Sequence, residues 1–206
     1  MPRDKALVRA AAHAAGWFVW RDNALMSSQQ TPSDGVLFDF TRGDATVEWS
    51  AIDDAVMGGI SRSRLSYTTD GYAVFEGEVS LANGGGFASV RCRPLPLGLA
   101  GATVCRIEVM GDGRRYKLNL RTEDTFDGVN YQVRFDPPAN EWLPISLPLT
   151  SFAPSWRGRP VPDAPRLDPA RIRQVGLMIA DRQAGPFRLA IRRISLTRDP
   201  GAFETE

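Results

Sequence analysis

Two adjacent carboxylates beside a glycine pair form the densest chemical signature in this 206-residue sequence. Asp53 and Asp54 are candidate cation ligands, because Ca²⁺ binds carboxylate and carbonyl oxygens. The alternating acidic ladder of a calcium loop is absent, however, and aspartate near glycine commonly accepts backbone N–H groups in a turn. We therefore favour a turn-forming role and predict neither a metal nor a cofactor. The whole loop signature consists of Trp49, Asp53, Asp54, Met57, Gly58, Gly59 and Ser61.

A second acid pair, Glu76 and Glu78, lies on one face of a predicted strand, because strand side chains alternate. Two facing acids in a cleft are what glycoside hydrolysis requires. Arg62 and Arg64 lie on a nearby predicted strand, and cross-strand ion pairs explain the same residues without catalysis. The single histidine, His13, weakens the Ser-His-Asp and Cys-His alternatives. We predict a protein that is not an enzyme and has no catalytic residue, with a hydrolase as the minor alternative.

The cysteines carry little functional signal. Cys92 and Cys105 are 13 positions apart, with no CxxC motif and no histidine nearby. A structural zinc site usually needs four Cys or His ligands. We expect both thiols to be small apolar core groups, although the sequence leaves open whether they pair.

Polar side chains alternate along two consecutive predicted strands. Asn119 and Arg121 follow Lys117 on one strand, and Gln132 and Arg134 follow Asn130 on the next. The short connection between them, residues 122–128, makes these strands hairpin partners. The paired residues then form a ladder of amides and cations on one sheet face. This ladder is either an ordinary solvated face or a recognition surface for an anionic, sugar-like or polypeptide ligand.

Charge is segregated along the chain. Residues 155–198 contain ten arginines and three aspartates, a net charge of +7, while the remainder carries −6. Within this basic segment, Trp156 and Arg159 lie in a proline-rich stretch, and Trp and Arg are enriched at protein-interaction hot spots. The overall net charge of +1 argues against nucleic acid as a partner. Arginine supplies 23 of the 25 basic residues, a composition that favours a bacterial source.

The elements that must position these residues are short strands. Apolar residues alternate with polar ones throughout the body of the chain, which is typical of half-buried antiparallel strands. The alternating segments are 36–40, 64–67, 75–81, 105–109, 116–121, 129–135, 143–147, 175–179 and 187–191. Turn sequences separate them, and we predict hairpins at 69–71 and 112–113. A change of phase predicts a bulge between Ile191 and Ile194. Residues 153–170 lack periodicity and predict a long surface loop.

Four regions follow from these patterns. Residues 1–26 predict a basic amphipathic helix that packs on its own domain or contacts a membrane surface or partner. Residues 27–35 predict a linker, residues 36–198 a β-sandwich, and residues 199–206 a tail. The apolar run near the N-terminus is too short to span a bilayer. We expect a cytoplasmic location with peripheral membrane contact.

The body of the sequence resembles the complex I intermediate-associated protein 30 family. The specific part is Asp53-Asp54-Ala55-Val56-Met57-Gly58-Gly59-Ile60-Ser61, and residues 38–40, 75–77, 86–91, 111–116 and 185–187 also fit. The resemblance covers residues 36–197. It implies an all-β, galactose-binding-like jelly-roll sandwich, and a binding or chaperone-like role in the assembly of respiratory complex I.

Two functions of different classes follow. The first is a module that holds a protein intermediate during assembly of a membrane or redox complex, with complex I subunits as the candidate partners. Its expected contacts are Asn119, Arg121, Gln132, Arg134, Trp156 and Arg159, and residues 53–61 would shape one rim. The alternative is a carbohydrate-binding module, in which Trp49 or Trp156 would stack on a sugar.

Overall fold

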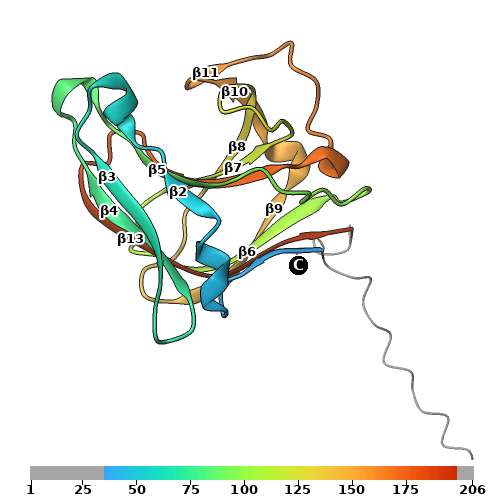
Figure 1. The fold of residues 1–206 in the computed structure, drawn as a ribbon, viewed down its shortest axis with the longest axis horizontal. Coiled ribbons are helices and arrows are strands. Elements are labelled where there is room, and N and C mark those ends of the chain that lie inside the picture. Colours follow the sequence, from blue (N-terminus) through green and yellow to red (C-terminus); the bar gives the residue numbers. More distant parts are fainter. Residues whose placement is uncertain (1–34, 199–206) are drawn as a thin grey trace, which may run out of the picture. The chain divides into compact units, whose positions relative to one another are not determined.

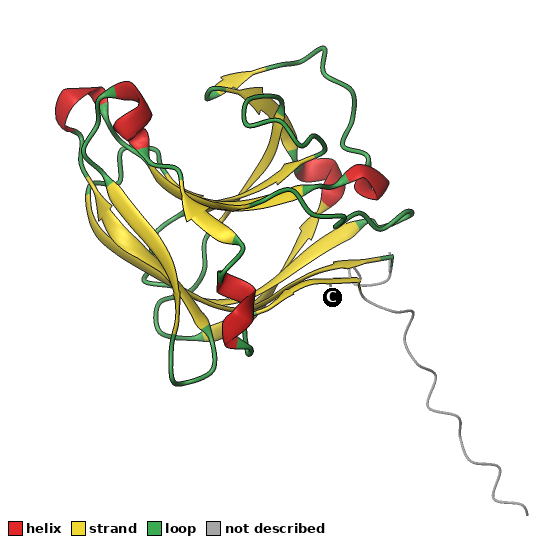
Figure 2. Ribbon diagram, viewed as in Figure 1, coloured by secondary structure: helices red, strands yellow, loops and turns green. Residues whose placement is uncertain are grey.

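The computed structural model describes residues 35–198. These residues form an all-β sandwich of two antiparallel sheets, with helix limited to short 3₁₀ turns (Figures 1 and 2). The sandwich confirms the predicted fold class. The expected N-terminal helix, residues 27–34 of the linker and the tail at 199–206 lie outside the described residues.

One sheet has six strands in the order β3-β4-β13-β6-β9, with β1 also paired to β13. Its strands are β1 (Gly35–Asp39), β3 (Arg62–Tyr67), β4 (Ala73–Val79), β6 (Val104–Met110), β9 (Trp142–Pro148) and β13 (Gly185–Thr197). The long β13 pairs with β4 through its first half and with β1 through its second. The predicted bulge is confirmed, because the register of β13 against β6 shifts between Ile191 and Arg193.

The other sheet has seven strands in the order β11-β10-β8-β7-β12-β5-β2. Its strands are β2 (Trp49–Ala51), β5 (Ala88–Cys92), β7 (Tyr116–Arg121), β8 (Asn130–Phe135), β10 (Ala153–Trp156), β11 (Arg159–Pro160) and β12 (Gln174–Ile179). The 3₁₀ turns are η1 (Gly43–Thr46), η2 (Asp54–Met57), η3 (Ala82–Gly84), η4 (Leu149–Ser151) and η5 (Pro169–Arg171). The turn η2 therefore lies near the β2 edge, opposite the β10–β11 hairpin (Figure 1).

The hydrophobic core lies between the two sheets. It is formed by the apolar side chains that alternate with polar ones along the strands. Tyr116, Leu118 and Leu120 of β7 are fully buried, as the period of two predicts. Cys92 and Cys105 are buried free thiols, which confirms their expected role as apolar core groups. Burial raises the pKa of Cys92 to about 11 and that of Cys105 to about 12, so neither thiol ionises readily near neutral pH.

Two local predictions are wrong. The turn at Asp112-Gly113 does not close a hairpin, because β6 and β7 belong to different sheets. The Asp112 carboxylate instead accepts the backbone N–H groups of Arg114 and Arg188, and this fixes the crossover between sheets. Residues 153–170 are also not entirely a loop, since β10 pairs with β8 over Ala153–Ser155. Proline is tolerated in such short strands near a sheet edge.

A close approach of β3 and β4 generates the first prediction. A Cβ atom on Gly77 would overlap the backbone carbonyl of Arg62 in the neighbouring strand. Replacing Gly77 with Ala should lower the free energy of unfolding by about 2–3 kcal/mol, because the strands must separate. Urea denaturation measures this change. Gly43→Ala is the control, since the three atoms nearest to its Cβ would belong to the exposed ring of Tyr67, a side chain that can shift. Equal stability of the two variants would contradict the packing described.

Candidate functional site

The Asp54 carboxylate is the anchor of the loop signature. Asp54 is fully buried, and its two oxygens accept four hydrogen bonds. Ser61 donates its backbone N–H at 2.9 Å and its hydroxyl at 2.6 Å. The N–H groups of Gly86 and Phe87 donate at 2.8 and 3.3 Å. One carboxylate therefore joins η2, the start of β3 and the segment that enters β5.

The Asp53 carboxylate makes a parallel set of contacts. It accepts the backbone N–H of Ser63 at 2.9 Å, the Ser63 hydroxyl at 2.6 Å and the backbone N–H of Ser89 at 3.0 Å. The expectation that the aspartates accept backbone N–H groups is confirmed, but these bonds reach distant segments instead of closing a local turn. Among the described residues, no cluster of three or more His, Cys, Asp or Glu side chains could hold a metal.

The remaining signature residues complete this framework. Gly58 has φ +89°, a left-handed conformation that favours glycine, and it ends η2. A Cβ on Gly59 would overlap the Asp54 carboxyl group. Trp49 is buried and its ring contacts Phe38 at a centroid distance of 4.9 Å. The aspartates, glycines and serine of the signature therefore have a structural role. We call the two carboxylates of Asp53 and Asp54, with the backbone and serine groups that bond to them, the clasp.

The predicted polar ladder exists, but it is more enclosed than expected. The register pairs Asn119 with Gln132 and Lys117 with Arg134 across β7 and β8, which confirms the hairpin. Asn119 and Arg121 are only 8% and 5% exposed, so the expectation of an open surface there is wrong for these two residues. The connection at residues 122–128 and the neighbouring strands supply their partners.

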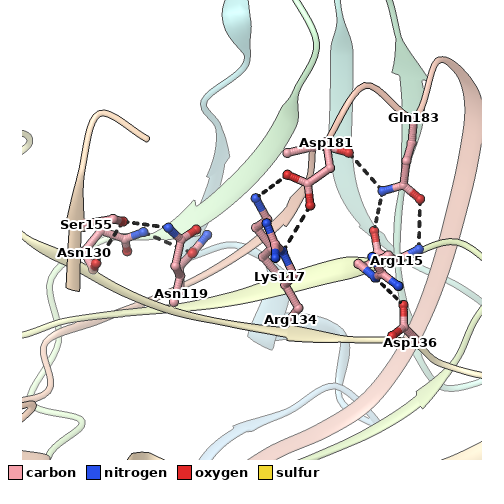
Figure 3. A network of polar contacts seen from close by, with 11 residues as sticks. Arg115, Lys117, Asn119, Asn130, Arg134, Asp136, Ser155, Asp181 and Gln183 are labelled. Carbon is pink, nitrogen blue, oxygen red and sulfur yellow. Dashed lines mark hydrogen bonds and ion pairs between the residues drawn. The ribbon is translucent and has the colours of Figure 1, made fainter. Parts of the chain in front are cut away.

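Several polar side chains of this ladder bond to one another or to neighbouring segments (Figure 3). The Asn130 amide donates to the Asn119 side-chain oxygen at 3.0 Å, and Ser155 donates to the Asn130 carbonyl at 3.1 Å. Lys117 and Arg134 both contact Asp181, at 2.8 and 3.2 Å. Burial alone raises the pKa of Asp181, but hydrogen bonding and charge from Lys117 and Arg134 outweigh it, so the net shift is downward.

Trp156 is tied to the 122–128 connection. Its indole N–H donates to Asp127 at 2.8 Å, and Arg157 contacts the other oxygen of Asp127 at 2.5 Å. The hydrogen bond from Arg157 is the main cause that lowers the pKa of Asp127. Trp156 remains half exposed, and Arg159 beside it on β11 is exposed. These two residues are therefore accessible at the β10–β11 edge.

The connection also carries a contact that sequence reasoning missed. The backbone carbonyl of Phe126 accepts hydrogen bonds from both Arg91 and Arg121. The Arg91 guanidinium lies 4.9 Å from the centre of the Phe126 ring. An apolar residue in an otherwise polar connection was the available signal for Phe126. Arg91 was not predictable as its neighbour, because the order of nonconsecutive strands was unknown.

Three exposed apolar side chains define what we call the apolar rim: Met57, Ile60 and Phe126, which are 65%, 56% and 69% exposed. Ile60 and Phe126 line the same surface hollow of about 490 Å³, together with Arg62 and residues of the clasp. Met57 belongs to the same clasped loop as Ile60. The hydrogen bonds of Asp54 thus fix a loop on which Met57 and Ile60 are exposed.

The acid pair on β4 has ordinary cross-strand partners. Glu76 lies opposite Arg64 and contacts it at 2.6 Å, while Glu78 lies opposite Arg62. Arg188 lies on the other side of Glu76, at 3.9 Å. The contact between Arg64 and Glu76 agrees with the predicted cross-strand ion pair, and Glu78 is shown only opposite Arg62 in the register.

Comparisons with known proteins agree with the signature. The family described as "Complex I intermediate-associated protein 30" matches residues 38–191. A Drosophila melanogaster protein named "Complex I intermediate-associated protein 30, mitochondrial" is 27% identical over 82% of this chain and 64% of its own length. A Neurospora crassa protein of the same name is 25% identical over 73% of this chain and 62% of its own. The chain therefore matches somewhat less than two thirds of these relatives.

A solved structure extends the comparison to the fold. The family 11 carbohydrate-binding module of a Clostridium thermocellum cellulase superposes with a TM-score of 0.60 and 16% identity, over 80% of this chain and 94% of the module. This likeness concerns the fold alone and confirms the predicted galactose-binding-like jelly roll. Within residues 35–198, no helix is long and apolar enough to cross a membrane.

The clasp generates the second prediction. Burial raises the pKa of Asp54, but hydrogen bonds from Ser61, Gly86 and Phe87 outweigh it and hold the pKa below 3.8. The carboxylate therefore stabilises the fold above that pH, and its contribution is lost as pH falls through the lowered pKa. Asp54→Asn should cost about 2–3 kcal/mol at pH 7, because the amide cannot accept all four bonds.

Urea denaturation at a series of pH values measures the effect. The difference between wild type and Asp54→Asn should narrow as pH falls below about 4. Asp44→Asn, at an exposed position, should leave stability near neutral pH almost unchanged. A constant difference at every pH would show that the charge of Asp54 is not what stabilises the clasp.

Proposed function

The chain belongs to the complex I intermediate-associated protein 30 family, and we propose that it binds a protein intermediate during assembly of a membrane or redox complex. Complex I subunits are the candidate partners, by the names of its relatives. The proposed mode is capture without catalysis. The match to residues 38–191 spans nearly the whole sandwich, so the proposal concerns the sandwich itself.

The observation that carries the proposal is the apolar rim. Large apolar side chains exposed together on a monomer commonly mark an interaction surface. Here the backbone beneath them is held by the clasp on one side and by Arg91 and Arg121 on the other. A surface fixed before binding loses less conformational entropy when a partner docks. The side of the rim that carries Met57 and Ile60 therefore has the properties of a preformed docking site.

The residues first predicted as contacts divide into two groups under this proposal. Asn119, Arg121 and Gln132 support the sheet face from within its hydrogen-bond network. Arg134, Trp156 and Arg159 remain accessible and are proposed as flanking contacts for a larger partner. Exposed tryptophan and arginine side chains suit a protein interface.

The carbohydrate alternative loses one of its predicted contacts. Trp49 is 9% exposed and packs against Phe38, so it cannot stack on a sugar ring. Trp156 is half exposed, and the Arg157 guanidinium already lies 4.9 Å from the centre of its ring. The fold likeness to a carbohydrate-binding module does not by itself assign a sugar to this chain. Sugar binding is therefore kept as an outcome of the test below.

The cytoplasmic location and peripheral membrane contact remain predictions. Two relatives are named as mitochondrial proteins. The segment proposed to contact a membrane, residues 1–26, lies outside the described residues.

The third prediction tests the rim by capture of partners. Met57→Ser combined with Ile60→Ser removes two exposed apolar groups, so the fold should persist. Gentle crosslinking in the native host and mass spectrometry should show complex I subunits or assembly intermediates with the wild-type chain. Their recovery should fall about tenfold or more in the double variant, as expected when hot-spot side chains are truncated.

Val36→Ser combined with Val47→Ser is the matched control, since both valines are exposed outside the rim. This control should capture partners as well as the wild type does. Equal capture by the rim variant would remove the rim from the interface. Recovery of no protein above background, together with saturable binding on a glycan panel, would replace the proposal with the carbohydrate alternative.

A further inference from the structure

Two guanidinium groups converge on a single backbone oxygen beneath the 122–128 connection. Arg121 donates to the Phe126 carbonyl from Nη1 at 2.7 Å. Arg91 donates to the same oxygen from Nη1 and Nη2, each at 3.2 Å. Three N–H groups from two cations therefore share one uncharged acceptor.

The electrostatics of this arrangement are unbalanced. Within the described part of the chain, no carboxylate lies at ion-pair distance from Arg91 or Arg121. Two acids lie nearby, beyond that distance: Glu123 accepts a hydrogen bond from the Thr125 hydroxyl, and Asp127 is engaged by Trp156 and Arg157. Arg121 is 5% exposed, and its Nε and Nη2 atoms are buried with no hydrogen-bond partner. Burial and the charge of Arg121 lower the pKa of Arg91 to about 10.

Such an arrangement is costly for stability alone. Buried cations are normally paired, because desolvation of an unpaired charge is unfavourable. Buried N–H groups without an acceptor add a further penalty. Both penalties fall if an anion accepts from the free donors. The arrangement is therefore better suited to a ligand than to the fold.

The sheet topology builds this pair from three strands. Arg91 on β5 lies opposite Gly176 on β12, and Arg121 on β7 lies opposite Gln174 of the same strand. Gly176 has no side chain to separate the residues on either side of it; a Cβ there would lie 3.7 Å from the Cβ of Arg91. The arginines thus reach one another across a central strand, on the face that points away from the core.

We propose that Arg91 and Arg121 form a binding site for an oxyanion, either a carboxylate or a phosphate group. The Phe126 carbonyl oxygen lies where an oxygen of that group would accept hydrogen bonds. An oxyanion offers several acceptor oxygens and a negative charge, which match the forked donors of two guanidinium groups. The site shares Phe126 with the rim, but its arginines are not rim residues, and it does not require the docking role of Met57 and Ile60.

The 122–128 connection acts as the cover of the site. Its Phe126 ring lies over Arg91, and Gln174 donates to the carbonyl of Glu123 at 2.7 Å. An anion that bridges the free Nε and Nη2 groups of Arg121 and the guanidinium of Arg91 competes with the Phe126 carbonyl for the Arg91 donors, so the cover must lift when the anion binds. Weakening the cover without removing an arginine should therefore strengthen anion binding.

The fourth prediction uses inorganic phosphate and succinate as probes. Each is titrated into the purified chain at pH 7 and constant ionic strength, maintained with sodium chloride. Binding is followed by calorimetry and by the rise in Tm. We expect saturable binding of at least one probe, and the probe that binds identifies the phosphate or carboxylate class.

Two variants and one control make the test specific. Arg91→Gln should weaken binding about tenfold or more, the loss expected for charge-assisted hydrogen bonds. Phe126→Ala should strengthen binding about two- to fivefold, because it removes the cation–π contact that holds the cover. Arg64→Gln, an exposed arginine on the other sheet, should bind as the wild type does.

The outcomes separate clearly. Gain of affinity in Phe126→Ala supports the site even if Arg91→Gln folds poorly, because both arginines are retained. Failure of both probes to bind the wild type and Phe126→Ala would overturn the proposal. Equal binding by folded Arg91→Gln and wild type would also overturn it. None of these results depends on whether Met57 and Ile60 capture a protein.

Discussion

A buried carboxylate that must be satisfied by protein donors is the constraint on which the signature region depends. Asp54 is removed from water, so its charge is tolerable only if N–H and O–H groups surround it. Those donors come from Ser61, Gly86 and Phe87, which belong to segments far apart in sequence. Gly59 must lack a side chain because the carboxyl group occupies that space. A motif that resembles a cation loop is therefore an internal clasp.

This clasp links the fold to the proposed function. By fixing both ends of the loop that carries Met57 and Ile60, it keeps apolar groups at the surface, next to a hollow shared with Phe126. The opposite side of that hollow is held differently, by two arginines on one carbonyl oxygen. On the Asp54 side, the buried charge is fully hydrogen-bonded within the protein. On the arginine side, two N–H-bearing nitrogens of Arg121 have no acceptor. The difference is why we assign docking to the rim and anion binding to the arginine pair.

The sequence predicted the sandwich because strand periodicity is a local property. The alternation in Tyr116–Arg121 and the bulge near Ile191 follow from it, and the short connection at residues 122–128 adds the hairpin of β7 and β8. The predictions that were wrong depended on contacts between segments far apart in the sequence. The turn at Asp112 crosses between sheets, and Arg121 is buried by a connection whose position no local pattern reveals. The sequence predicted that Asp54 accepts backbone N–H groups. It did not predict Gly86 as a donor, because Gly86 is 32 positions away.

The central claim is that Asp54 holds the rim segment in place, and native-state hydrogen exchange tests it most directly. The account predicts slow exchange at the amides of Ser61, Gly86 and Phe87 near neutral pH, comparable to amides within β7. It also predicts that Asp54→Asn, under conditions where it stays folded, loses protection at all three amides together while β7 remains protected. Fast exchange at these amides in the wild type, or unchanged protection in the variant, would contradict the account.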